Sequence, residues 1–511
     1  MEAPPGFWQR DAAHGPLPRT PMTNSLLPED DGLVAASEDF GLILTPRVTD
    51  IGGWFYGSIE AVGGPAGAAP PPGWLLPILL RLSPDARRRL RRCREVVRTG
   101  HAERVVDRWY AEQQPVFRER IHRLRDTDLP AADNLPELLA EAKALCHDGV
   151  HAHFPVIMAH VAGVGELGVI CQRLLGWDQR EVMALLAGLS SKTTEPLDAL
   201  AEDDTVFLRE YGFRSLILEV AEPTLGEMPG LTRRLLRKSG DDGALSRQRE
   251  EKVAAARKLL HGADRTAFDR ALAIATKAYP AREDNVFYCM DGPVGIARRV
   301  VVEAGRRLTE RDQLDECDDV FFVEIDEVIA ALTDRRDLRP VVKENRALHQ
   351  LMLANPGPPT YGKDPGPPPS TRWLPAGIRD FTEAVAWGIN EILQQNLSVR
   401  TAEPQNQVLT GTPASKGRYR GEVRVVVGEP DFDRLRKGDV LVCPSTRPSW
   451  SVLFPLMGAI VTDSGGALSH PAIIAREYGI PAVVAMGNAT TVLHDGQTVV
   501  VDGDRGTVEI V

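Results

Sequence analysis

The stretch Thr462–Ala485, TDSGGALSHPAIIAREYGIPAVVA, decides the fold of the C-terminal part of this chain. It begins at the end of an apolar run, Gly458–Thr462, which predicts a strand. The paired glycines Gly465 and Gly466 predict a tight turn soon after this strand. The stretch therefore opens with a strand that ends in a glycine turn.

A short helix is expected next. Pro471 stands at the first helical position, which proline favours, and Ala472–Tyr478 continues the helix. Gly479 is typical of a helix end, and Ile480–Pro481 leads into another strand. His470 therefore comes at the N-terminal end of a helix. Free backbone N–H groups and the helix dipole favour an anion there, such as a phosphoryl group.

This placement indicates chemistry at His470. An imidazole with one nitrogen held by a neighbour offers the other nitrogen as a nucleophile. Ser469 is placed to hydrogen-bond His470 or a phosphate oxygen, and Arg476 could neutralise charge from the helix flank. We interpret His470, Ser469 and Arg476 as catalytic, and Gly465 and Gly466 as phosphate-binding. A structural histidine at a tight turn is the alternative.

The same stretch resembles the phosphohistidine signature of phosphoenolpyruvate-utilising enzymes, in which Gly-Gly, Ser-His, Ile, Ala-Arg and Gly-Ile-Pro recur in order. The matching positions are Gly465, Gly466, Ser469, His470, Ile473, Ala475, Arg476, Gly479, Ile480 and Pro481. The resemblance covers about Leu409–Val511. It implies a small swivelling α/β domain with His470 as its reactive residue.

Strand patterns surround the signature, and helical patterns fill the centre of the chain. The expected strands are Glu422–Val427, Val440–Cys443, Ala459–Thr462, Ala482–Ala485 and Thr498–Val501. Apolar residues at helical spacing predict helices at Asp85–Thr99, His101–Arg125, Leu135–Leu145, Phe154–Leu175, Glu181–Leu189, Ser246–Leu260, Arg265–Ala278, Ile296–Thr309, Glu324–Leu332 and Ile378–Gln394. The fold class is α+β multidomain, a large mostly α-helical substrate-binding domain followed by the small α/β domain.

Composition shifts divide the chain. Residues 1–20, rich in Pro, Gly and Ala, predict a flexible leader. Residues 21–396 are expected to form the helical domain, with a proline-rich loop at 355–370. Residues 397–408 predict a linker, and residues 409–511 the phosphohistidine domain.

The central part is similar to the substrate-binding part of rifampicin-phosphotransferase-like proteins. Four segments carry this resemblance: PMTNSLL at Pro21–Leu27, FLREYGFRS at Phe207–Ser215, REDNVFY at Arg282–Tyr288 and DDVFFVEIDEV at Asp318–Val328. The resemblance implies that this part of the chain binds a sizeable organic substrate.

The same resemblance suggests substrate-binding residues. Arg282 and Glu283 lie in a segment that faces the substrate in the family, although a solvated helix end is the alternative. Relatives often carry Gly-His-Arg where this chain has a phenylalanine, Phe213, before Arg214. Arg214 and Glu219 remain as candidate site residues.

Four histidines cluster in CHDGVHAHFPVIMAH, namely His147, His151, His153 and His160. His147 and His151 are four apart and could share a helix face, as metal ligands do. The sequence offers no third ligand in register, so no metal site is predicted. We expect His151 and His153 to line the substrate pocket by family position; a satisfied core histidine is the alternative.

Composition limits the function classes. The 511 residues carry a net charge of −11, which argues against nucleic acid as a partner. Six scattered cysteines without a CxxC pair suit a reducing compartment. The N-terminus lacks a signal-peptide pattern, and the apolar patch Trp74–Leu82 is shorter than a membrane span. We expect a cytoplasmic protein without a membrane partner.

The resemblance also implies a phosphate donor. Relatives begin with an ATP-grasp domain that phosphorylates the histidine, and the 20 residues before Pro21 are too few to supply one. No P-loop motif occurs. The chain itself is expected to hold no cofactor, and a separate ATP-grasp protein using ATP and magnesium would phosphorylate His470.

Three functions stay open. The first is phosphotransfer through His470 to a bulky small molecule. The second is phosphate-independent acid–base catalysis by His470, such as dehydration or cyclisation in natural-product biosynthesis. The third is a non-catalytic carrier or regulator.

Overall fold

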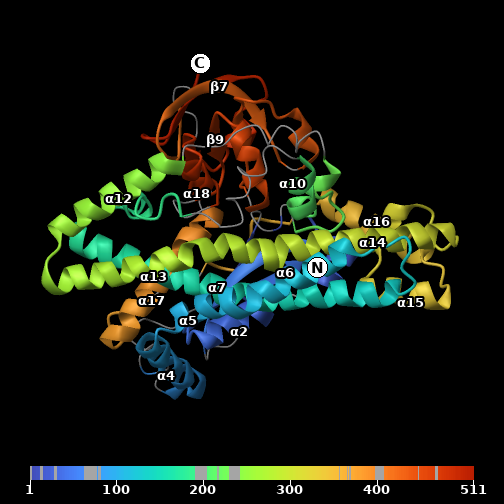
Figure 1. Ribbon diagram of the computed structural model, residues 1–511, viewed down its shortest axis with the longest axis horizontal. Coiled ribbons are helices and arrows are strands. Elements are labelled where there is room, and N and C mark those ends of the chain that lie inside the picture. Colours follow the sequence, from blue (N-terminus) through green and yellow to red (C-terminus); the bar gives the residue numbers. More distant parts are fainter. Residues whose placement is uncertain are drawn as a thin grey trace. The chain divides into compact units, whose positions relative to one another are not determined.

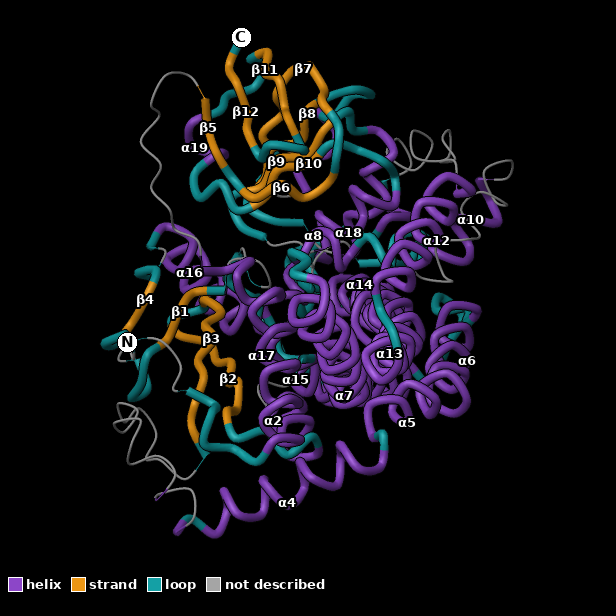
Figure 2. The backbone as a smooth tube through the Cα atoms, turned by 90° about the vertical axis from the view of Figure 1, so that its left-hand side faces the viewer, coloured by secondary structure: helices purple, strands orange, loops and turns teal. Residues whose placement is uncertain are grey.

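The computed structural model describes residues 3–11, 15, 17–27, 31–62, 78, 82–189, 204–215, 218–228, 242–355, 357–364, 366, 370–397, 408–427, 429–446, 448–465 and 470–511. The chain divides into two compact units, each built from separate stretches of sequence. The first comprises residues 1–159, 213–224 and 285–382, and the second comprises residues 160–212, 225–284 and 383–511. Helices predominate, and the strands form two sheets, β1–β4 and β5–β12 (Figure 2).

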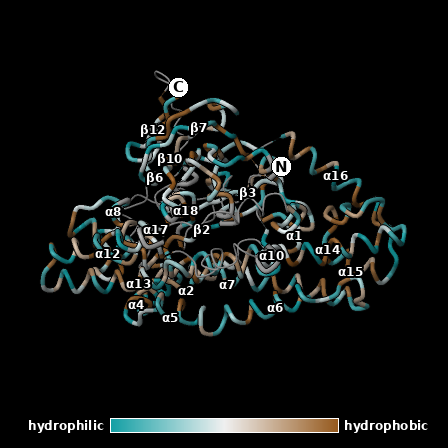
Figure 3. Tube along the Cα trace, turned by 45° about the horizontal axis from the view of Figure 1, so that its top comes forward, coloured by the Kyte–Doolittle hydropathy of each residue, from teal (hydrophilic) through white to brown (hydrophobic). Residues whose placement is uncertain are grey.

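The first unit is mainly helical. Its helices are α1 (Pro21–Leu26), α2 (Asp31–Asp39), α4 (Pro84–Thr99), α5 (His101–Arg108), the π-helix η1 (Trp109–Gln113), α6 (Gln114–Asp126), the π-helix η3 (Phe287–Asp291), α14 (Gly292–Glu310), the 3₁₀-helix η4 (Cys317–Phe322), α15 (Ile325–Asp334) and α16 (Arg339–Ala354). Hydrophilic and hydrophobic segments alternate along these helices, as amphipathic packing requires (Figure 3). The predicted helix His101–Arg125 is interrupted by the π-turn η1.

An antiparallel sheet corrects two sequence predictions. Its order is β2 (Leu44–Ile51), β3 (Trp54–Ala61), β1 (Trp8–Arg10) and β4 (Thr360–Tyr361). Strand β1 lies within residues 1–20, so the predicted flexible leader is wrong for residues 8–10. Burial explains this, because Trp8 is 5% exposed and packs with Trp54 and Tyr56. Strand β4 lies within the predicted loop 355–370, at the sheet edge, where neighbouring prolines are tolerated.

The second unit is also rich in helices, and some of them extend across the boundary in sequence between the units. Its helices are α8 (Gln179–Met183), α10 (Asp204–Tyr211), the 3₁₀-helix η2 (Leu225–Glu227) and α12 (Asp242–Leu259), with most of α13 (Gly262–Val286) and α17 (Ala376–Leu397). Helices α12 and α13 confirm the predicted helices Ser246–Leu260 and Arg265–Ala278, although α13 extends eight residues further, to Val286.

Helix α7 (Leu135–Leu175) has 41 residues and was predicted as two helices (Figure 1). The helix continues through Pro155, where two separate helices were expected. Glycines allow close packing: a Cβ atom at Gly165 would lie 1.9 Å from the carbonyl oxygen of Ala384, and one at Gly168 would lie 2.6 Å from the Trp387 ring.

The length and composition of α7 would also allow it to cross a membrane. Most of its apolar part is buried within the protein, as in the core helix of a soluble protein. The absence of a membrane span therefore stays a prediction.

Residues 408–511 form an α/β domain around an eight-stranded sheet. The strand order is β5 (Val408–Thr410), β12 (Thr507–Ile510), β11 (Thr498–Asp502), β7 (Arg418–Val425), β8 (Val440–Cys443), β9 (Ala459–Thr462), β10 (Ala482–Val484) and β6 (Thr412–Ser415). Strands β7 to β10 are parallel, and the remaining pairings are antiparallel. The helical elements are η5 (Glu429–Arg434), η6 (Pro448–Leu456), α18 (His470–Glu477) and α19 (Ala489–Val492).

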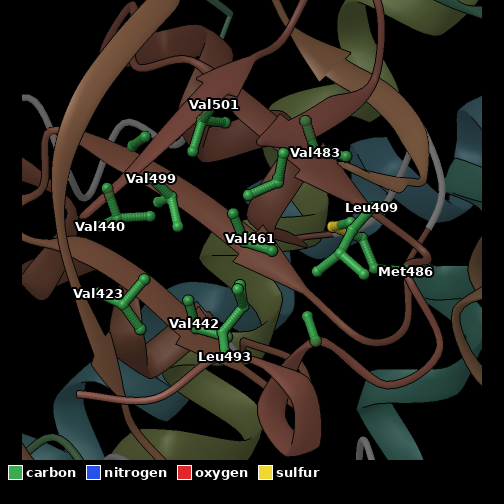
Figure 4. Close-up of a cluster of buried hydrophobic side chains, with 13 residues drawn as sticks. Leu409, Val423, Val440, Val442, Val461, Val483, Met486, Leu493, Val499 and Val501 are labelled. Atoms are coloured by element: carbon green, nitrogen blue, oxygen red, sulfur yellow. The ribbon is translucent and has the colours of Figure 1, made fainter. Parts of the chain in front are cut away.

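Valines fill the core of this domain. Val440, Val461 and Val499 are fully buried and converge from different strands (Figure 4). Such β-branched side chains suit a pleated, buried surface. The strand patterns recognised in the sequence therefore correspond to the faces that build this core.

Candidate functional site

The carboxyl ends of the parallel strands β8, β9 and β10 bring three loops together. The backbone N–H of Asp463, just after β9, donates to the carbonyl of Cys443 at the end of β8, at 3.0 Å. The hydroxyl of Ser464 donates to the carbonyl of Pro444 at 2.8 Å. On the other side, the N–H of Gly487 donates to the carbonyl of Asp463 at 2.7 Å. Ligands of α/β sheets commonly bind at such an edge.

The carboxylate of Asp463 joins the loops after β9 and β10. It accepts a hydrogen bond from the backbone N–H of Thr490 at 2.9 Å and another from the Thr490 hydroxyl. Burial raises the pKa of Asp463, while the hydrogen bonds from Thr490 and from the backbone of Ala489 act in the opposite direction. Asp463 was not predicted, although it lies within the signature stretch. We call Asp463 and Thr490 the loop clamp.

The turn and helix of the signature follow the loop clamp. Gly465 is buried and has φ 131°, a backbone conformation that favours glycine. Helix α18 begins at His470 and ends before Gly479, which has φ 61°. The predicted strand and helix are therefore confirmed, and the predicted turn is described only as far as Gly465. Gly466, Ser469 and the side chain of His470 lie outside the described residues.

Arg476 contacts the sheet. Its guanidinium donates to the carbonyl of Ala414 in β6 at 3.1 Å. Six helical residues separate Arg476 from His470, which corresponds to about 9 Å along the axis and about 240° of rotation. This contact helps to hold α18 against β6, and a phosphate-neutralising role for Arg476 stays a prediction.

Arg214 forms a buried ion pair in the first unit. Its Nε and Nη2 atoms each lie 3.0 Å from Oδ2 of Asp291, and both side chains are less than a tenth exposed. Asp291 ends the π-helix η3, a rare form of helix that is frequent at functional sites. Phe213 packs on Phe287 of η3, with ring centroids 5.8 Å apart. A phenylalanine thus occupies an apolar position where relatives were expected to carry histidine.

Glu219 has a structural position. Its carboxylate accepts hydrogen bonds from the backbone N–H of Thr20 at 3.0 Å, from the Thr20 hydroxyl at 2.7 Å and from the Thr23 hydroxyl at 2.6 Å. The N–H of Ala221 adds a fourth at 3.0 Å. Thr20 is the N-cap of α1, so Glu219 fixes the start of that helix. The carboxylate of Glu219, predicted to bind substrate, therefore accepts its hydrogen bonds from residues of the chain itself.

The two predicted pocket histidines differ. His151 is exposed on α7, whereas Nδ1 of His153 lies 2.7 Å from Oδ1 of Asn285. Asn285 is fully buried, and its amide also donates to Sγ of Cys289 at 3.3 Å. The prediction did not include Asn285, although a polar residue in the run NVFYCMD could have drawn attention to it.

Arg282 and Glu283 lie near the end of α13, which continues directly into η3, and are 8% and 9% exposed. The solvated helix end, the alternative in the sequence analysis, is therefore wrong. His160 of α7 is 1% exposed, and its Nδ1 lies 3.4 Å from the carbonyl of Ala278 in α13. Burial, with a contribution from Arg282, lowers the pKa of His160 to about 3, so the imidazole is neutral. Its Nε2 has no hydrogen-bond partner within the described parts of the chain.

Throughout the residues that the structure describes, no three His, Cys, Asp or Glu side chains gather closely enough to hold a metal ion.

Comparison with known proteins identifies the C-terminal domain. Residues 435–506 match the family described as PEP-utilising enzyme, mobile domain. The match includes the loop clamp, the glycine turn and α18 with His470 at its start. The phosphohistidine-domain resemblance inferred from the signature is thereby confirmed.

Three relatives extend the comparison. A chondramide synthase of Chondromyces crocatus is 31% identical over 273 residues, 52% of this chain and 7% of the relative. A phosphoenolpyruvate synthase of Aeropyrum pernix is 50% identical over 109 residues, 21% of this chain and 13% of the relative. A rifampicin phosphotransferase of Bacillus cereus is 28% identical over 216 residues, 42% of this chain and 22% of the relative.

The matched parts are less than a quarter of each of these relatives. Two of the relatives are named rifampicin phosphotransferases. Residues 435–506 are therefore similar to the mobile domain of PEP-utilising enzymes, and a longer part of the chain is similar to rifampicin phosphotransferases.

Proposed function

We propose that His470 carries a phosphoryl group and transfers it to a hydroxyl group of a bulky small molecule bound by the helical part. The observation that carries the proposal is the position of His470, the first residue of α18, within a segment that matches the mobile domain. The helix N-terminus offers free N–H groups and a positive dipole end to a phosphoryl group.

The chemistry has two balanced steps. In the first, an imidazole nitrogen of His470 attacks the phosphorus of a donor phosphate. The P–O bond to the leaving group breaks, and its electron pair leaves with that group. In the second, the substrate oxygen attacks phosphorus and loses its proton to a base, the P–N bond breaks, and its electron pair returns to the imidazole. Positioning and charge neutralisation supply most of the catalysis in such in-line transfers.

The donor and the substrate contacts are part of the proposal. A separate ATP-grasp protein, using ATP and magnesium, would supply the phosphate. Arg282 and Glu283 are candidate substrate contacts because they are charged, buried and lie in the segment that faces the substrate in the family that the sequence resembles. The two side chains also form an ion pair, with Nε of Arg282 4.0 Å from Oε1 of Glu283.

One observation favours a second function. Phe213 packs against Phe287 at a position where the family resemblance led us to expect histidine. A site without that imidazole could use His470 itself as a general acid or base, without phosphate. Dehydration or cyclisation in natural-product biosynthesis would be such a reaction, and one relative is named a chondramide synthase.

Intact-mass spectrometry distinguishes the two functions. The full-length protein is incubated with ATP, magnesium and a cell extract, and His470→Ala is treated in parallel. His494→Ala is the matched control, since His494 is an exposed histidine of the same domain. An acid-labile phosphoryl adduct on the wild type and on His494→Ala, but not on His470→Ala, supports phosphotransfer. If none forms under conditions that phosphorylate a rifampicin phosphotransferase, phosphotransfer is rejected in favour of acid–base catalysis.

A further inference from the structure

Helix α4 carries seven arginines but only two acidic residues, Asp85 and Glu95. Four of the arginines, Arg87, Arg91, Arg94 and Arg98, follow the spacing i, i+4, i+7 and i+11. At about 100° per residue they share a stripe about 60° wide and about 16 Å long. We call these four residues the arginine stripe.

The arginine stripe faces away from the core. Its four side chains are exposed, whereas the opposite face of α4 buries Ala86, Arg89, Cys93 and Val96. None of the four guanidinium groups has a salt bridge or side-chain hydrogen bond with the residues that the structure describes. The other arginines of α4 differ: Arg88, Arg89 and Arg92 pair with acidic residues.

The buried face holds α4 in place. Arg89 lies 2.9 Å from Glu38 and donates to the carbonyl of Leu42. Arg92 donates through Nε to the carbonyl of Asp39 at 2.7 Å. A Cβ atom at Gly41 would lie 2.4 Å from the backbone nitrogen of Cys93, so the backbone at Gly41 packs closely against the backbone of α4. The arginine stripe is therefore presented by a fixed element.

The arginine stripe costs helix stability, because like charges three and four residues apart repel. Glu95, the acidic residue at helical spacing from Arg91 and Arg98, pairs with Arg92 instead. An external anion would offset the repulsion. Arginine's planar fork matches carboxylate oxygens in pairs, which lysine does not.

We propose that the arginine stripe docks an acidic helix of a partner protein. A partner helix with carboxylates at i, i+4, i+7 and i+11 would present the same spacing over the same length. The whole chain has a net charge of −11 although α4 is strongly basic, so the rest of the chain is more acidic still. A long polyanion such as DNA, or an anionic membrane, would extend past α4 and meet this acidic remainder. A single helix would not.

Fluorescence anisotropy with a defined probe tests this. The probe is a labelled alanine-based helical peptide with Glu at i, i+4, i+7 and i+11, titrated with the full-length protein. The stripe variant Arg87→Glu, Arg91→Glu, Arg94→Glu, Arg98→Glu is expected to bind about tenfold or more weakly. Binding to wild type should also weaken with added salt. The same four positions changed to Gln replace the stripe variant if that variant does not fold.

A matched control carries the same charge change elsewhere. Arg118, Arg270, Arg372 and Arg505 are exposed and dispersed, and their four changes to Glu should leave peptide binding within about twofold of wild type. A peptide with Lys in place of Glu should bind the stripe variant and not the wild type. The proposal is overturned if both variants lose binding equally. It is also overturned if a DNA duplex or phosphatidylglycerol vesicles bind the arginine stripe while the peptide does not.

Discussion

Two regions of the molecule differ in the sequence separation between their functional side chains and the residues that hold them in place. Around β9, Ser464 bonds to Pro444 and Asp463 to Thr490, over separations of 20 and 27 positions. In the first unit, Arg214 pairs with Asp291 across 77 positions. Thr20 and Glu219 are separated by 199 positions.

This difference in sequence separation determines where function can be recognised in a sequence. The loops around β9 are built from neighbouring strands, so their glycines, proline and histidine recur as one compact signature. The buried charges of the helical part depend on distant partners, and each looks like an ordinary surface residue when considered alone. We therefore expect changes in the helical part to affect folding most, and changes near β9 to affect loop geometry.

The largest effect is expected at the ion pair of Arg214 and Asp291. Asp291→Ala leaves the buried guanidinium without this carboxylate, which should lower the free energy of unfolding by about 3–5 kcal/mol. Urea denaturation measures the change. The matched control is the double variant Arg214→Met, Asp291→Leu, which removes both charges and should lose much less. Equal losses in both variants would show that packing, and not the unpaired charge, determines stability here.

His160 provides a test of burial in the second unit. Burial lowers its pKa to about 3 from 6.5, so between these values the unfolded chain binds a proton that the folded protein does not. The stabilising contribution is therefore complete above pH 6.5 and declines as the pH falls toward 3. The slope should reach about 1.4 kcal/mol per pH unit.

Urea denaturation across that pH range checks the slope. His160→Phe should remove it, since phenylalanine keeps an aromatic ring in the core but does not titrate. His494→Phe, at an exposed histidine, should leave the pH dependence as in wild type. A slope that persists unchanged in His160→Phe would assign the pH dependence to other groups.

The two regions also differ in how far sequence could predict them. Strands β8 and β9 were predicted with the bounds observed, because each is an uninterrupted apolar run. Strands β5 and β6 were missed, since each is three or four residues long and depends on pairing with β12 and β10.

Candidate site residues follow the same division. The signature predicted the turn at Gly465 and the helix that starts with His470. Glu219 was predicted as a substrate contact, and its hydrogen bonds to Thr20 and Thr23 were not predicted. These partners lie 199 and 196 positions away in the sequence. Asp291 was not predicted, because only its burial distinguishes it.

A smaller effect is expected at the turn of the signature. Gly465→Ala forces a side chain into φ 131°, which should cost about 1–3 kcal/mol in the free energy of unfolding. The matched control is Gly479→Ala at φ 61°, where a Cβ atom would meet nothing within 4 Å and the cost should be about 1 kcal/mol. Gly465→Ala should also reduce phosphorylation of His470, measured as above, more than Gly479→Ala does. A larger loss of phosphorylation in Gly479→Ala would show that the conformation of Gly465 does not determine the reactivity of His470.

The smallest effect, and the most specific to the loop clamp, is expected from Asp463→Asn. Burial raises the pKa of Asp463 above its ordinary value of 3.8, so just above pH 3.8 the folded protein holds a proton that the unfolded chain has lost. The stabilising contribution of this proton is complete below pH 3.8 and disappears as the pH rises through the folded-state pKa. Asparagine does not titrate, so Asp463→Asn should gain stability relative to wild type as the pH rises through this window.

Urea denaturation at a series of pH values measures that difference. Glu509→Gln is the control, because Glu509 is an exposed carboxylate of the same domain. A difference between Asp463→Asn and wild type that stays constant with pH would mean that Asp463 titrates alike in the folded and unfolded chains. In that case the loop clamp is held by hydrogen-bond geometry alone.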